Sequence, residues 1–509
     1  MFLVLALISI CCSSNILLTV PFSGSHFNAL KNIAEILSVQ GHNVTLLALE
    51  KDDRFKIMEN VTLIHPMKWE VGKVGELISL TAENIVRNVR SSDMVLEALG
   101  SENWGKIMVM VRDFMVSDEM QGILSQGNFS VIISDIRAVK GISIAARSWG
   151  IPIVTFCPAI SYFPSRVQQG LPMLVSSEPG FNMMIRRDHI PTFSERCKSL
   201  WVFLRSLLAF KLRDRLWDES LKKFGISKLS DLDDQVKLYL VNDDIAFSFP
   251  FLSPPNLITI GGYNFKPAKS LPAEFKTFLD SSNEQPVVYL SLGSYATLKM
   301  IPWLNIIISS LVKINARVIL KSSSSDEFLQ LSNNFLIRSW VPQIDLLGSG
   351  KVTVFISHCG NNGRLESIYY QVPLLCIPLW GDQLLNSNLV KYKGFGEMIL
   401  KEDVEENNVV ELLKKLIDNH GYYIEQSRKA VDIFKTAPVS SKNKLIYYID
   451  LLIRHGNLDF LQNKIIKRQG FHEIYNLDIA FVAVLAVVSF IGTLLFILKR
   501  CLKKKIKSE

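Results

Sequence analysis

Short apolar runs rich in β-branched residues alternate with segments of helical periodicity, and this alternation restricts the possible folds more than any other feature of the chain. In the first half the strand-like runs lie at 16–21, 44–49, 131–134 and 153–156, and helical segments lie at 27–40 and 142–149. After Pro286 the pattern restarts, with strand-like runs at 287–292, 318–320, 335–339, 352–357 and 374–378 and a helical segment at 303–314. Strands that alternate with helices form parallel sheets with helices on both faces. We therefore predict an α/β chain with two Rossmann-like domains.

The length and charge of the chain indicate a folded multidomain protein without a nucleic-acid partner. At 509 residues the chain is too long for a single hydrophobic core. Of the formal net charge of +8, residues 499–509 contribute six basic side chains against one acidic one, which leaves only +3 for the rest. A body so nearly neutral offers no broad basic face, so we expect no binding to nucleic acid.

Both ends of the chain carry apolar segments. Residues 1–14 predict a secretory signal, with a buried N-terminal strand as the alternative. Residues 479–498 are uncharged and long enough to cross a bilayer, and the basic tail 499–509 follows directly. Because basic segments stay on the cytosolic side, we expect a type I single-pass protein with a luminal body. Lys505 and Lys507 resemble a retrieval signal, so we expect residence in the endoplasmic-reticulum membrane.

A luminal body would contain four of the seven cysteines and three glycosylation sequons. The cysteines are Cys157, Cys197, Cys359 and Cys376, and their spacing shows no dense disulfide framework, although pairing is possible in this compartment. The sequons begin at Asn43, Asn60 and Asn128. Asn43 is expected to begin a strand, where a glycan fits poorly, so we favour Asn60 and Asn128 as glycosylation sites.

The turn-rich stretch around Pro254, Pro255, Gly261 and Gly262 suggests a linker at about 262–285. We therefore assign residues 15–270 to an N-terminal domain and residues 271–425 to a C-terminal domain. Residues 426–478 are expected to form helices that pack back on the first half and lead to the membrane. Two such domains would face each other across a cleft at the carboxyl ends of their strands, where open α/β folds bind ligands.

The most informative motif runs from Trp340 to Gln383. Its central part predicts a buried strand that ends at Ser357 and a helix that begins near Asn362, with His358, Gly360 and Gly363 at the junction. Glycines allow the backbone to approach a ligand, and a helix N-terminus offers free N–H groups to a diphosphate. His358 could bond a phosphate oxygen, and Glu366 could accept from ribose hydroxyls. Upstream, Trp340 offers a flat face for a base and Gln343 an amide to pair with its edge.

These residues resemble the signature of the UDP-glycosyltransferase family, and the two chain ends are similar to those of its animal UDP-glucuronosyltransferase branch. The resemblance extends over almost the whole chain. It implies the GT-B fold, a UDP-sugar bound in the C-terminal half and a lipophilic acceptor bound in the N-terminal half. It also implies no cofactor or metal, since the UDP-sugar is a co-substrate. By family analogy we expect homo-oligomers or hetero-oligomers with related transferases.

The resemblance assigns roles to individual positions. Trp340 and Gln343 would hold the uracil, and Glu366 would hold the ribose. His358, Asn362 and Gly363 would contact the diphosphate, with Ser294 beside it. Asp382 and Gln383 would bind the sugar hydroxyls. The catalytic histidine of the family matches His26 in Gly24-Ser25-His26, and its partner aspartate matches Asp135. A histidine with a pKa of about 6.5 can take the proton of a hydroxyl acceptor. A carboxylate on its other nitrogen would fix the tautomer.

The expected function is inverting transfer of a hexosyl group, above all glucuronosyl, to small lipophilic hydroxyl compounds. The alternatives are a glucosyl- or galactosyltransferase of the same fold, and a catalytically silent member that binds lipophiles or pairs with active relatives. A Rossmann oxidoreductase is excluded because no Gly-x-Gly-x-x-Gly follows the first strand. The chain departs from the branch at Tyr370-Gln371, at Ile319-Leu320-Lys321, and at residues 134–138, where a Pro-Cys-Gly style run is missing. None of these departures removes a proposed catalytic group.

Overall fold

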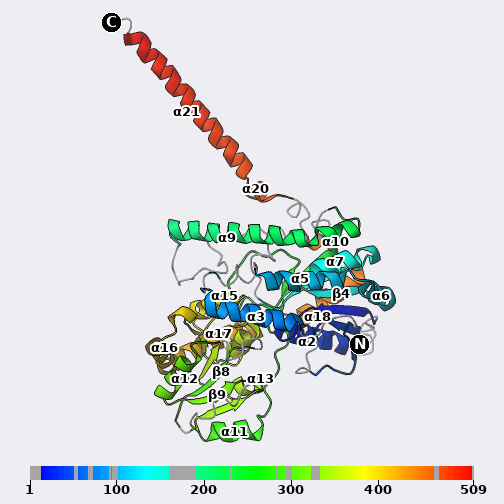
Figure 1. The fold of residues 1–509 in the computed structure, drawn as a ribbon, viewed down its shortest axis with the longest axis vertical. Coiled ribbons are helices and arrows are strands. Elements are labelled where there is room, and N and C mark those ends of the chain that lie inside the picture. Colours follow the sequence, from blue (N-terminus) through cyan, green and yellow to red (C-terminus); the bar gives the residue numbers. More distant parts are fainter. Residues whose placement is uncertain are drawn as a thin grey trace.

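The computed structural model describes residues 13–50, 56–66, 73–90, 93, 101–159, 191–227, 232, 234–282, 284–293, 301–322, 333–462 and 469–506. Two parallel sheets with flanking helices form the body of the molecule, and the long helix α21 (Leu477–Ile506) projects from one end of it (Figure 1). The prediction of two Rossmann-like domains is confirmed.

The first sheet has seven strands in the order β3-β2-β1-β4-β5-β6-β7. The strands are β1 (Asn15–Val20), β2 (Asn43–Ala48), β3 (Val61–Ile64), β4 (Val131–Asp135), β5 (Ile153–Cys157), β6 (Val236–Val241) and β7 (Leu257–Thr259). The helices of this half are α2 (Ser25–Val39), α3 (Lys73–Asn88), α5 (Glu102–Met115), α6 (Asp118–Gly127), α7 (Val139–Ala146), α9 (Phe193–Asp214) and α10 (Asp218–Lys223), with short 3₁₀ turns η1 (Arg147–Trp149) and η2 (Arg215–Trp217). The central strands β4 and β5 are buried along their whole length, as parallel strands covered on both faces must be.

The second sheet has six strands in the order β10-β9-β8-β11-β12-β13. They are β8 (Val287–Ser291), β9 (Arg317–Lys321), β10 (Phe335–Arg338), β11 (Val354–Ser357), β12 (Leu374–Cys376) and β13 (Gly396–Met398). The accompanying helices are α11 (Ala273–Asp280), α12 (Leu304–Lys313), α13 (Gln343–Leu347), α14 (Asn361–Tyr369), α15 (Gln383–Lys393), α16 (Glu406–Asp418) and α17 (His420–Lys435), with the turn η6 (Lys401–Asp403). The stretch expected to be a linker at 262–285 contains α11, whose Phe275 and Leu279 are buried in the core of this half.

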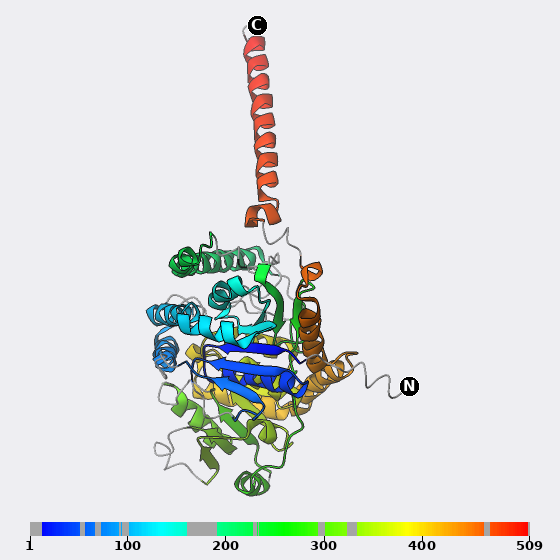
Figure 2. The same ribbon diagram turned by 90° about the vertical axis from the view of Figure 1, so that its right-hand side faces the viewer.

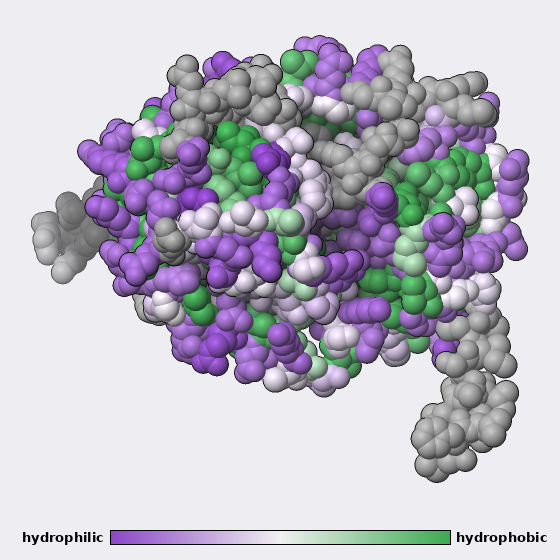
Figure 3. Space-filling model, turned by 90° about the horizontal axis from the view of Figure 1, so that it is seen from below, coloured by the Kyte–Doolittle hydropathy of each residue, from purple (hydrophilic) through white to green (hydrophobic). Residues whose placement is uncertain are grey.

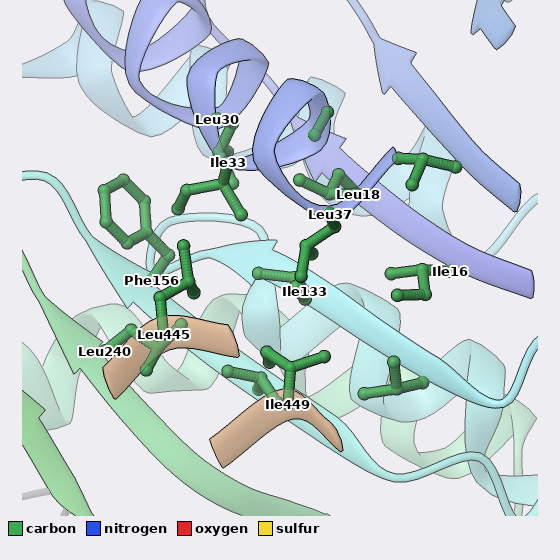
Figure 4. Close-up of a cluster of buried hydrophobic side chains, with 14 of the residues drawn as sticks. Ile16, Leu18, Leu30, Ile33, Leu37, Ile133, Phe156, Leu240, Leu445 and Ile449 are labelled. Atoms are coloured by element: carbon green, nitrogen blue, oxygen red, sulfur yellow. The ribbon is translucent and has the colours of Figure 1, made fainter. Parts of the chain in front are cut away.

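Two of the helices that follow the second sheet, α17 and α18, pack in different places. Ala430 and Val431 of α17 belong to the core around the second sheet, so the boundary expected after residue 425 falls inside a helix of that domain. By contrast, α18 (Ser441–His455) buries Leu445 and Ile449 against the first sheet and α2 (Figure 4). The chain therefore crosses back to the first half at about residue 440.

The C-terminal helix is a candidate membrane span. Within residues Leu477–Arg500 of α21, a stretch of 18 residues has a mean hydropathy of 2.8, and none of this stretch is buried against the body. The helix follows a short turn of helix, α20 (Phe471–Ile474), and stands away from both sheets (Figure 2). Its length of 24 residues exceeds the roughly 20 residues that a hydrocarbon core requires.

Cys359 and Cys376 form a disulfide between the end of β11 and β12, with their Cα atoms 5.4 Å apart. Cys157 is free and buried, and Cys197 is free and exposed. The disulfide joins strands that are already paired, which agrees with the expectation that cysteines do not build this fold. Among the sequon asparagines, Asn43 begins β2 as predicted.

Candidate active site

His26 and Asp135 follow neighbouring strands at the centre of the first sheet. β1 pairs with β2 on one side and with β4 on the other, so the strand order reverses between β1 and β4, which is where open α/β sheets bind ligands. His26 is the second residue of α2, which follows β1, and Asp135 is the last residue of β4. His26 Nδ1 lies 2.5 Å from Asp135 Oδ2, although the two residues are 109 positions apart in sequence.

The neighbours of the His26 ring determine which nitrogen carries the proton. A carboxylate only accepts hydrogen bonds, so Nδ1–H donates to Asp135. The guanidinium of Arg137 contacts the other nitrogen, Nε2, and because a guanidinium only donates, Nε2 presents a lone pair. Arg137 lies near the rings of Phe22 and Trp104, with its guanidinium carbon 5.4 and 5.6 Å from their centroids. The imidazole is thus neutral, with its proton on the side of Asp135.

Burial and nearby charges give the same result. Burial is the main cause that lowers the pKa of His26, and the positive charge of Arg137 lowers it further, against the attraction of Asp135. For Asp135, burial opposes ionisation, but attraction to His26 and the hydrogen bond between them hold the carboxyl pKa below its usual range. A neutral imidazole beside a carboxylate is the arrangement that a general base requires.

In the second half, His358 follows β11 and lies half-buried between the backbones of Gly293 and Gly360. A Cβ at Gly293 would stand 2.8 Å from His358 Nε2, and a Cβ at Gly360 would stand 2.5 Å from it, so the ring fits only against glycine. Burial lowers the pKa of His358 to about 4, with a further contribution from Lys321. Nδ1 of this neutral ring is buried and has no hydrogen-bond partner among the described residues.

The N-terminus of α14 follows at once. Its first intrahelical hydrogen bond runs from the Arg364 N–H to the Gly360 carbonyl. The N–H groups of residues 361–363 therefore have no acceptor within the helix and point out of its N-terminal end. Gly363 adds no side chain here. If it carried a Cβ, the nearest atom would be Gln343 Nε2 at 3.7 Å, which is an ordinary van der Waals contact. Three free N–H groups and the positive end of the helix dipole favour an anion such as a phosphate.

The residues expected to hold the nucleoside are connected to each other. Gln343 Nε2 donates to Glu366 Oε2 at 2.6 Å, and the Tyr289 hydroxyl donates to Gln343 Oε1 at 3.0 Å. Burial raises the pKa of Glu366 to about 7, against the effects of Gln343 and Lys321. Trp340, just before α13, is 61% exposed, so its indole ring is accessible to a ligand.

Asp382 and Gln383 lie at the start of α15, after β12. Gln383 Oε1 accepts from the backbone N–H groups of Leu379 and Trp380 at 2.8 and 3.1 Å. Asp382 Oδ2 accepts from Asn386 at 2.8 Å. These bonds hold the turn, and they leave Asp382 Oδ1 and the Gln383 amide nitrogen without a partner among the described residues. Gln383 thus has a structural function in addition to the sugar contact expected of it.

Side chains from the first half fix the α14 terminus in place. Asn242, directly after β6, donates to Asn362 Oδ1 at 2.8 Å. Asn361 donates to the carbonyls of Pro158 and Asn242 at 3.0 and 2.7 Å. Asn362, which was expected to meet the diphosphate, therefore also belongs to the contact between the two halves.

A buried ion pair strengthens the same contact. Arg364 of α14 donates to the Phe247 carbonyl at 2.7 Å and pairs with Asp243 at 3.4 Å, and both charged side chains are fully buried. The two halves also influence each other electrostatically, because the charge of Asp382 acts on His26 and raises its pKa. Asp382 of the second half is thus near enough to His26 for its charge to act on the ring.

Sequence reasoning missed two charged residues of this site, Arg137 and Lys321. The expected residue Ser294 lies outside the described part of the chain. Arg137 stands where the Pro-Cys-Gly style run is missing, and Lys321 stands where the strand lacks its usual tryptophan. Both departures were visible in the sequence, and a basic residue in each was the signal that could have identified them. In the part of the chain that the structure describes, no group of three or more His, Cys, Asp or Glu side chains could hold a metal ion.

Comparison with known proteins identifies the family of this chain. The model of the family described as UDP-glucoronosyl and UDP-glucosyl transferase matches residues 15–508. The human 2-hydroxyacylsphingosine 1-beta-galactosyltransferase is 30% identical over 78% of this chain and 72% of its own length. The rabbit (Oryctolagus cuniculus) UDP-glucuronosyltransferase 2C1 is 27% identical over 94% of this chain and 95% of its own length.

Solved structures show the same fold at low sequence identity. A Phytolacca americana UGT2 complexed with UDP-2fluoro-glucose and pterostilbene superposes with a TM-score of 0.59 and 17% identity, covering 87% of this chain and all of that one. The glycotransferase of kitacinnamycin superposes with a TM-score of 0.60 and 16% identity over 87% of this chain and 99% of its own. The fold is therefore GT-B, and the chain belongs to the UDP-glucuronosyl and UDP-glucosyl transferase family, whose members transfer a sugar from a UDP donor.

Proposed function

We propose that this transferase moves a hexosyl group from a UDP-sugar to a hydroxyl of small lipophilic acceptors, and that the favoured hexosyl group is glucuronosyl. His26 acts as the general base and Asp135 as its partner. The observation that carries the proposal is the 2.5 Å contact between His26 Nδ1 and Asp135 in a family of UDP-sugar transferases. The contact leaves Nε2 unprotonated and able to receive a proton.

In the proposed reaction the acceptor hydroxyl replaces the Arg137 N–H at His26 Nε2. As the acceptor oxygen bonds to the anomeric carbon, its proton moves to Nε2, and Asp135 stabilises the imidazolium that forms. The bond between the anomeric carbon and UDP breaks, and its electron pair leaves with the diphosphate. Attack from the side opposite UDP inverts the anomeric carbon.

The donor half stabilises the leaving group. The N–H groups of residues 361–363 and the dipole of α14 would meet the negative charge that develops on the diphosphate. Gln343 and Glu366 would bind the uridine, with Trp340 against the base, and Asp382 and Gln383 would bind sugar hydroxyls. We propose that no resident cofactor or metal takes part, since this helix end supplies the electrostatic stabilisation.

Two donors are supported by different observations. UDP-glucuronate is supported by the similarity to the rabbit glucuronosyltransferase over nearly the whole chain, and by Lys321, whose positive charge acts on the donor site and suits a uronate carboxylate. UDP-galactose is the second candidate, because the human galactosyltransferase shares 30% identity with this chain.

We further propose that α21 spans the endoplasmic-reticulum membrane once, with the body in the lumen. The mean hydropathy of 2.8 over 18 residues within Leu477–Arg500 supports the span, and the basic residues from Lys499 onward support this orientation. Lys505 and Lys507 support retention in that compartment.

Transfer by the full chain in membranes, with each of several UDP-sugars and a panel of phenols and steroids, tests the donor and the activity together. The His26→Ala variant should lose about 10²- to 10⁴-fold in kcat, the usual contribution of a general base. Its affinity for UDP should not change, because His26 contacts none of the described residues of the proposed UDP site. Normal turnover by this variant would eliminate His26 as the base.

A further inference from the structure

The helix α9 presents its apolar side to solvent. Leu200, Leu204, Leu208 and Leu212 recur every four residues, and each is at least 42% exposed. Trp201 lies beside them and is 62% exposed. Residues spaced by four fall on one face of a helix, so these side chains form a continuous stripe. We call this set of five residues the α9 stripe.

The opposite side of α9 carries less apolar surface than the stripe. Among the described side chains of α9 its buried residues are Ser199, Phe203 and Ser206, and the two serine hydroxyls donate back to the helix carbonyls of Glu195 and Val202 at 2.8 Å. An amphipathic surface helix of a soluble domain turns its apolar face to the core and its polar face to water. The orientation of α9 is the reverse, so its exposed face requires an apolar neighbour outside the body.

The borders of the stripe are basic. Arg196, Lys198 and Arg205 are exposed on α9. A helix with leucine and tryptophan on one face and lysine and arginine at its edges is typical of segments that lie in the membrane interface, where the cations meet lipid phosphates.

The position of α9 points to the same neighbour. α9 lies across the end of the body from which α20 and α21 project (Figures 1 and 2). At this end Gln462 is fixed to β6 by bonds to the carbonyls of Val236 and Lys237 at 3.2 and 3.3 Å. The 14 residues between Gln462 and α21 span at most about 50 Å, so a bilayer crossed by α21 lies close to this face.

A second exposed apolar side chain lies near the same exit. Phe460 of the turn η7 (Asp459–Leu461) is 74% exposed, two residues before Gln462. The opposite end of the body shows hydrophilic residues with small apolar patches between them (Figure 3). The apolar stripe is thus at the end of the molecule that carries the candidate membrane span.

We propose that α9 is a monotopic membrane helix, which inserts the α9 stripe into the interfacial region of the bilayer that α21 crosses. The body would then be held against the lipid at two points, and the first, acceptor-binding half would face the phase in which lipophilic compounds dissolve. This inference rests on the proposed location of α21 in a bilayer and is independent of the transfer reaction.

The test is a fluorescent probe on the full chain in phosphatidylcholine vesicles. Cys11, Cys12, Cys197 and Cys501 are replaced by serine, and the variant Leu208→Cys is labelled with the environment-sensitive dye NBD. Val312→Cys provides the matched control, since Val312 is an equally exposed apolar residue (54% against 59%) on α12, at the other end of the body (Figure 1). Thermal stabilisation by UDP reports that each labelled chain is folded.

We expect NBD at position 208 to emit at shorter wavelength, to be shielded from aqueous iodide, and to lose about half of its intensity or more when part of the lipid carries a nitroxide near the top of its acyl chain. NBD at position 312 should be quenched by iodide and not by the nitroxide lipid. Equal quenching by iodide at both positions would overturn the proposal. Shielding at position 208 without nitroxide quenching would also overturn it, because the stripe would then be covered by protein, such as a second copy of this chain. Insertion observed in a chain that transfers no sugar would leave this inference standing and refute only the proposed reaction.

Discussion

The substitution Asp135→Asn should disable the base while it changes almost nothing in shape. The backbone N–H of Arg137 donates to Asp135 Oδ1 at 2.9 Å, and this bond would orient the new amide with its oxygen at the same place. The amide nitrogen would then occupy the position of Oδ2, 2.5 Å from His26 Nδ1. Because an amide nitrogen only donates, Nδ1 would have to accept, and the proton would move to Nε2.

The cost follows from what His26 could no longer do. With a proton on Nε2 the imidazole cannot take one from the acceptor, and its N–H would face the donor groups of Arg137. A general base contributes about 10²- to 10⁴-fold, so kcat should fall by about 10³-fold, which corresponds to about 4 kcal/mol of transition-state stabilisation. Asp135→Ala should be less harmful than Asp135→Asn, because a cavity with water imposes no tautomer.

The assay measures kcat and KM for one phenolic acceptor with the full chain in membranes, at pH 7 and saturating UDP-sugar. UDP affinity, measured by thermal stabilisation, serves as the control and should equal that of the unsubstituted chain. Retention of more than about a tenth of kcat by Asp135→Asn would contradict the assigned tautomer, since a loss that small is below the usual contribution of a general base. Equal losses for the Asn and Ala variants would show that the charge of Asp135 matters and the orientation of its oxygens does not.

Three further substitutions test other parts of the site. Arg137→Gln removes a positive charge that lowers the pKa of His26, so the acid limb of the kcat profile, where the base becomes protonated, should move to higher pH. Glu366→Gln removes a carboxyl group whose pKa is raised to about 7 by burial. In calorimetric titrations, the UDP affinity of this variant should be roughly tenfold lower at pH 8, where the carboxylate of the unsubstituted chain is ionised. The affinity of the unsubstituted chain should decline between pH 8 and 6, whereas that of the variant should not. Arg364→Leu leaves Asp243 buried without its partner and should cost about 3–5 kcal/mol in denaturant unfolding, whereas Arg428→Ala, an exposed control, should change little.

Much of the fold was predictable because hydrophobic patterning determines parallel strands directly. The runs at 131–134 and 153–156 became β4 and β5 with boundaries shifted by one residue, since both strands are buried along their whole length. The linker was predicted less well, because its proline and glycine content hid α11, a helix of eight residues. The boundary after residue 425 was misplaced because an apolar stripe shows that a helix is buried but not against which sheet.

The single motifs of the candidate site, and a cleft between the two domains, could be predicted from the sequence, whereas some of the contacts between the motifs could not. Motifs near one strand end, such as His358 to Glu366, can be read locally because a single strand–turn–helix unit positions them. Arg137 and Lys321 could not be assigned in this way, because each acts on a residue from another strand–turn–helix unit: Arg137 on His26 of α2, and Lys321 on Glu366 of α14. Strand order decides those contacts, and a single sequence specifies strand order only through the packing of the whole domain.

The contact between the halves has a consequence for how the donor site is built. Asn361 and Asn362 stand at the very end of α14 whose N–H groups would hold the diphosphate, yet their side chains bond to Pro158 and Asn242 of the first half. A rotation that opened the two halves at this point would break these bonds and would leave the Arg364–Asp243 pair partly solvated. If the N–H groups of this helix end hold the diphosphate, as we propose, such an opening would also move His26 away from the donor. One interface between the halves would then position both the proposed base on the first half and the leaving group held by the second.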